Sequence, residues 1–303
     1  MSSASATPLL ELRNVRRTYG GRGGPFGQRA VVALDDFSIV IHDEQPSIVA
    51  IVGESGSGKT TMARLLLGLE TPSAGHVLYK GTDLQQLKRQ TWAEYRRNVQ
   101  AIFQDPFGVY NSFYKVDHVL TTPLRKFKLT RSREEEQQVI AQALRAVGLR
   151  PEDTLGRYPH QLSGGQRQRT MVARTLLLRP RVIVADEPVS MIDASLRATV
   201  LGNLLQLKRQ YGISLIYITH DLTTAYQISD RIVVLYRGRV VEEGDPDQIV
   251  NRPRHAYTRL LISSIPEPDP DRPWAEGELT SEDEALGEEL ELVSTGGHEV
   301  EGA

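Results

Sequence analysis

Eight residues early in the chain have the types and spacing of a phosphate-binding loop. Gly53–Thr60 reads Gly-Glu-Ser-Gly-Ser-Gly-Lys-Thr, which matches the P-loop pattern of glycines followed by a lysine and a hydroxyl residue. The glycines let backbone N–H groups converge on phosphate oxygens, while the lysine supplies positive charge and the threonine hydroxyl can bind Mg²⁺. The residues expected to contact phosphate or metal are Gly53, Ser55, Gly56, Gly58, Lys59, Thr60 and Thr61.

Two adjacent carboxylates follow an apolar run later in the chain. Arg181–Pro188 reads Arg-Val-Ile-Val-Ala-Asp-Glu-Pro, which predicts a buried strand that ends in Asp186 and Glu187. Such a strand would bring Asp186 to the edge of the site where a P-loop ATPase holds Mg²⁺, and Glu187 would face the γ-phosphate and a water molecule. The alternative is that both acids only begin a loop or cap the helix at Asp193. The P-loop in the same chain favours the catalytic interpretation.

A third motif, Leu162–Gln166, reads Leu-Ser-Gly-Gly-Gln and precedes a helix expected over Gln166–Leu178. A serine and free backbone N–H groups at a helix N-terminus can bind an anion. A chain that already has a P-loop has no evident need of this second site for its own nucleotide. The residues that would form it are Ser163, Gly164, Gly165 and Gln166.

Short buried strands that alternate with helices are expected to position these motifs. Continuous apolar runs are typical of parallel strands that are covered on both faces, and helical periodicity between them indicates an α/β core. The runs lie at Ser47–Val52, Val182–Ala185 and Ser214–Thr219, and the helical patterns lie at Thr60–Leu67, Asp193–Gln210 and Asp221–Ile228.

Two other regions interrupt this alternation. Leu9–Tyr19 and Val31–Ile41 read as an antiparallel pair of strands joined by the glycine-rich turn Gly20–Gln28. Residues 84–179 read as a mostly helical block, in which Arg131–Gly148 has a capping box, one apolar face and a terminal glycine. We therefore expect a P-loop α/β core with an antiparallel β subdomain and an inserted α-helical subdomain.

Composition bounds the class of protein. With 40% hydrophobic and 24% charged residues in 303, the chain is globular rather than disordered, and its apolar runs are too short to cross a bilayer. Its first residues do not resemble a secretory signal, so we expect an intracellular protein, and the absence of cysteine excludes disulfides and thiolate metal sites. Ten of the 38 acidic residues lie in Trp274–Ala303, which has no Lys or Arg and is expected to be a solvated tail.

The three motifs, in this order and over about residues 9–265, resemble the ATP-binding cassette (ABC) ATPases. In that family two subunits meet head to tail, and the Leu-Ser-Gly-Gly-Gln signature of one closes over the nucleotide held by the P-loop of the other. The resemblance thus accounts for the second anion site. It implies ATP and Mg²⁺ as the bound species and hydrolysis as the reaction.

The resemblance also implies roles for residues outside the three motifs. Gln104 in Ile-Phe-Gln-Asp-Pro is similar to the Q-loop glutamine, which contacts Mg²⁺ or the attacking water. Asp193 ends Ser-Met-Ile-Asp, which is similar to the D-loop at the dimer interface, and His220 in Ile-Thr-His-Asp is similar to the switch histidine beside the γ-phosphate. Tyr19 resembles the aromatic residue that stacks on adenine, although Phe26 lies nearby and a tyrosine that ends a strand is often only packed.

The segment after the core indicates a branch of the family. Asn251–Leu261, with Ile265 and Pro266 beyond it, resembles the C-terminal extension of the oligopeptide/dipeptide importer ATPases, and Gly23–Gly27 resembles an insertion in the second of their two ATPase subunits. An amphipathic helix that covers the domain edge is a compatible alternative for the extension. Departures from the family pattern in Ser-Met-Ile-Asp and after the Q-loop leave the solute open between peptides and oligosaccharides.

The resemblance implies a division of the chain and a set of partners. The expected parts are an ATPase domain over residues 9–250, an importer-type extension over 251–273 and the acidic tail over 274–303. The expected partners are two transmembrane permeases, a sister ATPase or a second copy in a head-to-tail dimer, and indirectly an extracytoplasmic solute-binding protein, with no nucleic acid. The chain would be peripheral, at the cytoplasmic face of the membrane. The main alternative is the ATPase of an exporter or lipoprotein-release complex, followed by a non-transport ABC ATPase.

Overall fold

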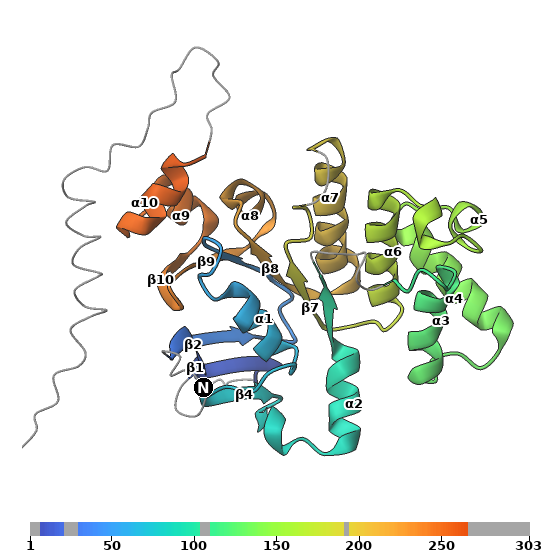
Figure 1. The fold of residues 1–303 in the computed structure, drawn as a ribbon, viewed down its shortest axis with the longest axis horizontal. Helices are drawn as coiled ribbons and strands as arrows, with labels where there is room; N and C mark the ends of the chain where they lie inside the picture. The colour runs from blue at the N-terminus through green and yellow to red at the C-terminus, as the bar shows by residue number, and fades with distance from the viewer. Residues whose placement is uncertain (1–6, 21–29, 104–109, 191–193, 266–303) are drawn as a thin grey trace, which may run out of the picture.

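The computed structural model describes residues 7–20, 30–103, 110–190 and 194–265 (Figure 1). Its larger sheet has the strand order β10-β9-β3-β8-β7-β6, and the strands are parallel except that β10 is antiparallel to β9. Every residue of β3 and β8 is buried, as expected for parallel strands covered on both faces. These strands span Ile48–Val52 (β3), Val99–Ile102 (β6), Val182–Asp186 (β7), Ser214–Thr219 (β8), Arg231–Tyr236 (β9) and Arg239–Gly244 (β10).

A smaller antiparallel sheet has the strand order β2-β1-β4-β5. The expected pairing of its first two strands is confirmed, because Leu10 lies opposite Ile41 and Tyr19 lies opposite Val31. The strands span Leu10–Tyr19 (β1), Val31–Ile41 (β2), Ala74–Tyr79 (β4) and Thr82–Asp83 (β5).

Helix α1 (Lys59–Leu66), which follows the P-loop, packs within the core that the two sheets share (Figure 1). Its Met62, Leu65 and Leu66 are fully buried in one apolar cluster with residues of β1, β2, β3 and β4. Because α1 packs against residues of both sheets, its position is fixed, and so is the end of the P-loop that joins it.

Most of the remaining helices form a second apolar cluster with the parallel sheet, whereas Tyr95 of α2 belongs to the first cluster. Helices α3, α4 and α5 make a lobe at one end of the molecule, and α9 and α10 lie at the other end beside β9 and β10 (Figure 1). These helices span Arg89–Asn98 (α2), Asp117–Lys126 (α3), Arg133–Ala146 (α4), Pro151–Thr154 (α5), Gly164–Leu176 (α6), Ala194–Tyr211 (α7), Leu222–Ile228 (α8), Pro246–Asn251 (α9) and Ala256–Ser263 (α10), with short 3₁₀ turns at Leu84–Gln86 and Pro159–Gln161.

The expected helical block over residues 84–179 is helical for most of its length but not throughout. It includes β6, whose residues Val99–Ile102 pair in parallel with Val182–Ala185 of β7. A strand of four residues has too few positions to show a period of its own, and its partner lies some 80 residues away in the sequence. Among the residues that the structure describes, no helix has the length and apolar character needed to span a membrane.

Candidate functional site

The carboxyl ends of three neighbouring parallel strands carry the predicted site. The P-loop follows β3, Glu187 follows β7 and His220 follows β8, and these strands lie in the order β3-β8-β7. Ligands of open α/β sheets bind at this edge, where the loops after the strands converge. The structure thus brings together the P-loop, the acidic pair and the histidine that the sequence places far apart.

The P-loop lies so close to its neighbours that two of its glycines have no space for a side chain. A Cβ on Gly53 would lie 2.1 Å from the carbonyl oxygen of Leu235 in β9, and one on Gly58 would lie 2.4 Å from that of Ala33 in β2. Gly58 also has a φ of 107°, a conformation that residues with a Cβ rarely adopt. The loop is therefore shaped by both sheets at once.

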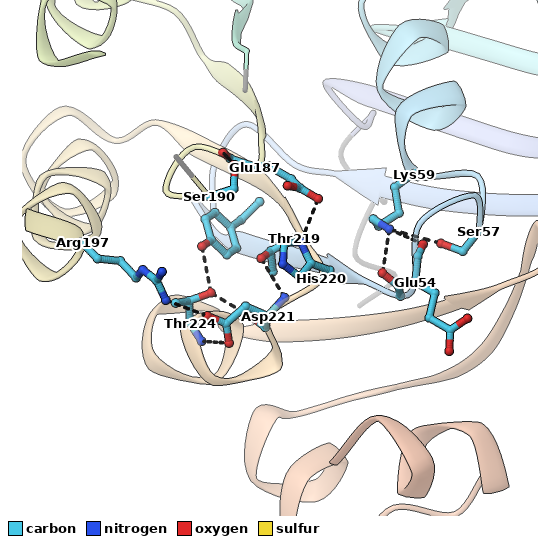
Figure 2. Close-up of polar contacts among 12 residues, drawn as sticks. Glu54, Ser57, Lys59, Glu187, Ser190, Arg197, Thr219, His220, Asp221 and Thr224 are labelled. Carbon is cyan, nitrogen blue, oxygen red and sulfur yellow. Dashed lines mark hydrogen bonds and ion pairs between the residues drawn. The ribbon is translucent and has the colours of Figure 1, made fainter. Parts of the chain in front are cut away.

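The Lys59 ammonium lies inside the loop rather than in solvent. Its Nζ donates to the carbonyl oxygens of Gly53 and Glu54, at 2.6 and 2.5 Å, and lies 3.5 Å from Oγ of Ser57 (Figure 2). The residue is 6% exposed. Burial lowers the pKa of Lys59, against the opposing attraction of Glu187 and Asp186. A poorly solvated cation whose hydrogen bonds go to neutral carbonyl and hydroxyl groups is suited to bind an anion.

Asp186 is the last residue of β7, and Glu187 follows it. Burial, and to a lesser extent the charge of Glu187, raises the pKa of Asp186, while Lys59 opposes that shift. Glu187 has a φ of 45°, in the left-handed region, while its N–H donates to the carbonyl of Ile218 in β8. This sharp change of direction brings the Glu187 side chain toward β8. Strain of this kind gathers at functional sites.

Glu187 and His220 form a pair across the strand ends. Oε1 of Glu187 lies 2.9 Å from Nδ1 of His220, whose side chain is 59% exposed whereas that of Glu187 is only 18% exposed (Figure 2). Asp221 fixes the turn behind His220, because its carboxylate caps α8 by accepting from the N–H groups of Thr223 and Thr224. A carboxylate and an imidazole held this way can orient a water molecule at the open side.

The Leu-Ser-Gly-Gly-Gln motif begins α6 at a different place on the surface. Oγ of Ser163 accepts from the N–H of Gln166, and the Gln166 side chain accepts from the N–H of Ser163, which is a complete capping box. Ser163 and Gly164 are exposed, and a Cβ on Gly164 would meet nothing within 4 Å. The helix N-terminus that the sequence predicted is thus formed by local contacts and is open to solvent.

Tyr19 lies beside the first helix, close to the P-loop. Its hydroxyl oxygen is 3.4 Å from Oγ1 of Thr61 and donates to Glu70, and the Arg17 guanidinium lies 4.7 Å from the ring centroid. The predicted stacking on adenine remains a prediction. Its position next to Thr61 is compatible with that role.

Several predicted residues cannot be placed. Gln104, Asp193, Phe26, the Gly23–Gly27 segment, residues 266–273 of the extension and the whole acidic tail over 274–303 lie outside the described residues. Ser55 on the loop and Thr60 in the first turn of α1 are described, and both are exposed.

Sequence reasoning missed two contacts that support the site. Tyr257 of α10 accepts a hydrogen bond from the N–H of Glu54 at 2.8 Å, and buried Gln168 of α6 donates to the carbonyl of Pro188, one residue after Glu187. Tyr257 lies in the extension that the sequence singled out, and Gln168 lies two residues after the signature. Neither residue belongs to a pattern that would reveal a partner so distant in the sequence.

Two family models match the chain. The ABC transporter model matches residues 34–190, about half of the chain, and the model of the oligopeptide/dipeptide transporter C-terminal region matches residues 241–288. The second match begins in β10 and includes α9 and α10, so the predicted resemblance of this segment to the oligopeptide/dipeptide transporters is confirmed.

Curated relatives match over most of the chain. The chain is 42% identical to the dipeptide transport ATP-binding protein DppF of Escherichia coli over 89% of its length and 81% of that protein's. It is 41% identical to the oligopeptide transport ATP-binding protein OppF of the same organism, over 87% of this chain and 79% of that protein.

Solved structures agree with the fold. The ATP-binding cassette MJ0796, in a dimeric post-hydrolysis state bound to ADP and Pi, matches with a TM-score of 0.68 at 28% identity, over 78% of this chain and 98% of that one. Together with the P-loop, the Glu187–His220 pair and the capped signature helix, these likenesses establish that the chain belongs to the ABC transporter family, as an ATP-binding cassette that carries the oligopeptide/dipeptide transporter C-terminal region.

Proposed function

We propose that this chain is the ATP-hydrolysing subunit of an ABC importer that takes up peptides. The observation that supports hydrolysis most directly is the Glu187–His220 pair, held at 2.9 Å beside the loop that buries Lys59. The transport assignment is supported by the relatives, which are named as dipeptide and oligopeptide transport ATP-binding proteins. Their names favour peptides over oligosaccharides, and the matching C-terminal region favours an importer over an exporter.

In this proposal the P-loop holds the triphosphate. The loop amides and the N-terminus of α1 bind phosphate oxygens, and Lys59 exchanges its contacts with the carbonyls of Gly53 and Glu54 for the β- and γ-phosphates. The exchange is favourable because the ammonium is already desolvated, so little hydration is lost when the phosphate arrives.

The residues present also fit Mg²⁺. Thr60 offers an exposed hydroxyl, Asp186 offers a carboxylate at the carboxyl end of β7, and Gln104 would complete a set of oxygen donors, which this cation prefers. When bound, Mg²⁺ would neutralise charge on the β- and γ-phosphates. A nearby cation would also hold the Asp186 carboxylate in its ionised form, against the burial that raises its pKa.

Glu187 and His220 act on the attacking water. The half-buried Glu187 carboxylate accepts a hydrogen bond from the water and polarises it, while the more exposed His220 supports the γ-phosphate side. Positioning and charge stabilisation supply most of the rate enhancement in such a site. The left-handed backbone of Glu187 is therefore part of how the carboxylate reaches the water.

The signature serves a second cassette in this proposal. Ser163, Gly165 and Gln166 stand at an exposed helix N-terminus that would close over the nucleotide of a head-to-tail partner, with Asp193 at the same interface and Tyr19 on the adenine. The matching cassette MJ0796 is described as a dimer. The partner here is a sister ATPase or a second copy of this chain. The two cassettes bind two permeases at the cytoplasmic face of the membrane, and a solute-binding protein outside delivers the solute to the permeases.

In this proposal the chain has three parts. Residues 9–250 form the ATPase domain, 251–273 form the importer-type extension, and 274–303 form an acidic tail.

The deciding experiment is Glu187→Gln in the full-length chain. We expect ATP binding to be retained, and turnover to fall by about 100-fold or more, because the amide cannot polarise water as a carboxylate does. Glu136→Gln is the control, since Glu136 is a buried carboxylate of α4, paired with Arg125 at 2.8 Å and far in the sequence from the site. Unchanged hydrolysis in Glu187→Gln would remove Glu187 from this role.

The transport assignment has its own test. Glu187→Gln protein purified from native membranes with ATP present should bring two permeases, an ATPase partner and a solute-binding protein, identified by mass spectrometry. Recovery of an export complex instead would leave the ATPase chemistry intact and overturn the importer.

A further inference from the structure

The C-terminal extension contacts the P-loop through one hydrogen bond. The backbone N–H of Glu54, the second residue of the loop, donates to the hydroxyl oxygen of Tyr257 at 2.8 Å. Tyr257 lies in the first turn of α10, 203 residues further along the chain. An amide of a phosphate-binding loop is thus held by a side chain from the extension.

Tyr257 is itself firmly held. It is 5% exposed, and its ring centroid lies 4.2 Å from that of Tyr236 in β9. The approach to α10 is fixed by Glu242 of β10, whose two carboxylate oxygens accept from the N–H groups of Arg254 and His255 at 2.9 and 3.0 Å. His255 then caps α10 by accepting from the N–H of Tyr257. The hydroxyl is therefore presented to the loop by a rigid support.

Glu54 connects Tyr257 to Lys59, the phosphate-binding lysine of the loop. Its carbonyl oxygen accepts from Nζ of Lys59 at 2.5 Å and from the N–H of Ser57 at 3.2 Å. The peptide group before Glu54 is thus bonded to Tyr257 and Lys59, and the one after it to Lys59 and Ser57. A shift of this residue would move the atoms that hold the ammonium.

A second contact with the loop comes from β9, the strand on which Tyr257 packs. Gly53 approaches the carbonyl of Leu235 so closely that no Cβ fits, and the next residue of β9 is Tyr236. The loop therefore contacts both β9 and α10, and these two elements contact each other through Tyr236 and Tyr257.

We propose that Tyr257 is a positioning residue for the P-loop, through which the extension tunes the affinity of the site for ATP. The inference rests on the proposed nucleotide function of the loop. Burial also raises the pKa of Tyr257 to about 12, so its hydroxyl stays neutral over the physiological range and the contact does not depend on pH there.

Tyr257→Phe in the full-length chain tests this proposal, because it keeps the ring and removes only the hydroxyl. We expect the Kd for ATP to rise about three- to tenfold, the size expected for loss of one hydrogen bond, with kcat changed less than twofold at saturating ATP. Amide hydrogen exchange in a peptide that contains Glu54 should become faster, because its N–H loses its acceptor.

Tyr79→Phe is the matched control. Tyr79 is also a buried tyrosine whose hydroxyl is hydrogen-bonded, to Glu94 and Asn98, but it lies in β4 of the antiparallel sheet. It should lose stability to a similar degree, with an unchanged Kd for ATP and unchanged exchange at Glu54.

Three results would count against the proposal. Equal Kd values for Tyr257→Phe and wild type would overturn it, and so would a lower thermal stability in both variants with no difference in ATP binding between them. If wild-type protein bound no ATP, the proposed function itself would fail and this inference with it. Faster exchange at Glu54 together with the higher Kd is the outcome that supports it.

Discussion

The P-loop and the signature motif both offer helix N-terminal amides to an anion, yet they are built in opposite ways. The P-loop is enclosed by β2, β9 and α10, and its lysine is 6% exposed. The signature is shaped by contacts between Ser163 and Gln166, three residues apart, and remains exposed. A loop held from several elements has a fixed shape within one chain, whereas a locally capped and open N-terminus is available to a second molecule.

Glycine-to-alanine substitutions in the P-loop and in the signature should show the largest difference between these two regions. Gly53→Ala should destabilise the fold by about 3 kcal/mol or more, because the new Cβ would lie 2.1 Å from a backbone oxygen. Gly164→Ala should stay within about 0.5 kcal/mol of wild type, since its Cβ meets nothing within 4 Å. Urea denaturation of both variants measures the difference. Similar stabilities would show that the P-loop is not as tightly enclosed as the geometry indicates.

Function at the signature should be lost without loss of the fold. Ser163→Ala removes a helix cap, which costs about 1 kcal/mol, and it should also lower ATP turnover by about tenfold or more if Ser163 contacts a partner's nucleotide. Ser132→Ala is the control, because Ser132 caps α4 in the same way by accepting from the N–H of Glu135. Steady-state hydrolysis and thermal melting of both variants decide the matter. Equal turnover in the two would leave the signature without its proposed role.

A smaller effect is expected at Asp186, whose partly buried carboxylate would serve Mg²⁺ binding at a cost to the stability of the fold. The pKa of Asp186 is raised above its ordinary value, so the folded state binds a proton at this carboxyl more tightly than the unfolded state does. The stability of the wild type therefore falls as pH rises from the ordinary pKa of an aspartate through the raised pKa of Asp186. Asp186→Asn removes the buried charge and should raise the Tm at pH 7 by about 1–2 °C while Mg²⁺-dependent hydrolysis falls. A lower Tm in this variant would mean that the charge is well compensated.

The smallest effect concerns the support behind Tyr257. Burial lowers the pKa of His255, whose neutral Nδ1 accepts from the N–H of Tyr257, so the stability from this cap is present at neutral pH and is lost as pH falls below about 6.5. His255→Asn keeps a capping acceptor that does not titrate. Between pH 7.5 and 5.5 the variant should lose about 1 °C less in Tm than the wild type. Parallel pH profiles would exclude His255 as the titrating group.

Local sequence patterns were sufficient for the elements that carry the motifs. The runs before Gly53, Asp186 and His220 predicted β3, β7 and β8 to within a residue or two, because fully buried parallel strands are continuous in their apolar character. The capping of α4 by Ser132 also follows from spacing alone, whereas α6 begins at Gly164, two residues before the expected start at Gln166. The resemblance to a family was needed for His220, since a histidine at a strand end has no pattern of its own.

Long-range contacts could not be read in this way. Nothing near Tyr257 in the sequence identifies Glu54 as its partner, and nothing near Gln168 identifies Pro188. The strand β6 was absorbed into the helical block, since its four residues have meaning only beside β7. These contacts and the strand β6 depend on which elements pack together in the fold, and not on the secondary-structure propensity of nearby residues.

The position of β3 has a consequence for the order in which the protein is made. Both neighbours of β3 in the sheet, β8 and β9, come from Ser214–Tyr236, whereas β3 itself ends at Val52. During synthesis the P-loop strand therefore emerges without sheet partners, for on the order of 10 s at ordinary rates of elongation. Until β8 and β9 have emerged, the five apolar residues of β3 have no neighbouring strand to pair with, so nucleotide binding is one of the last properties that the nascent chain acquires.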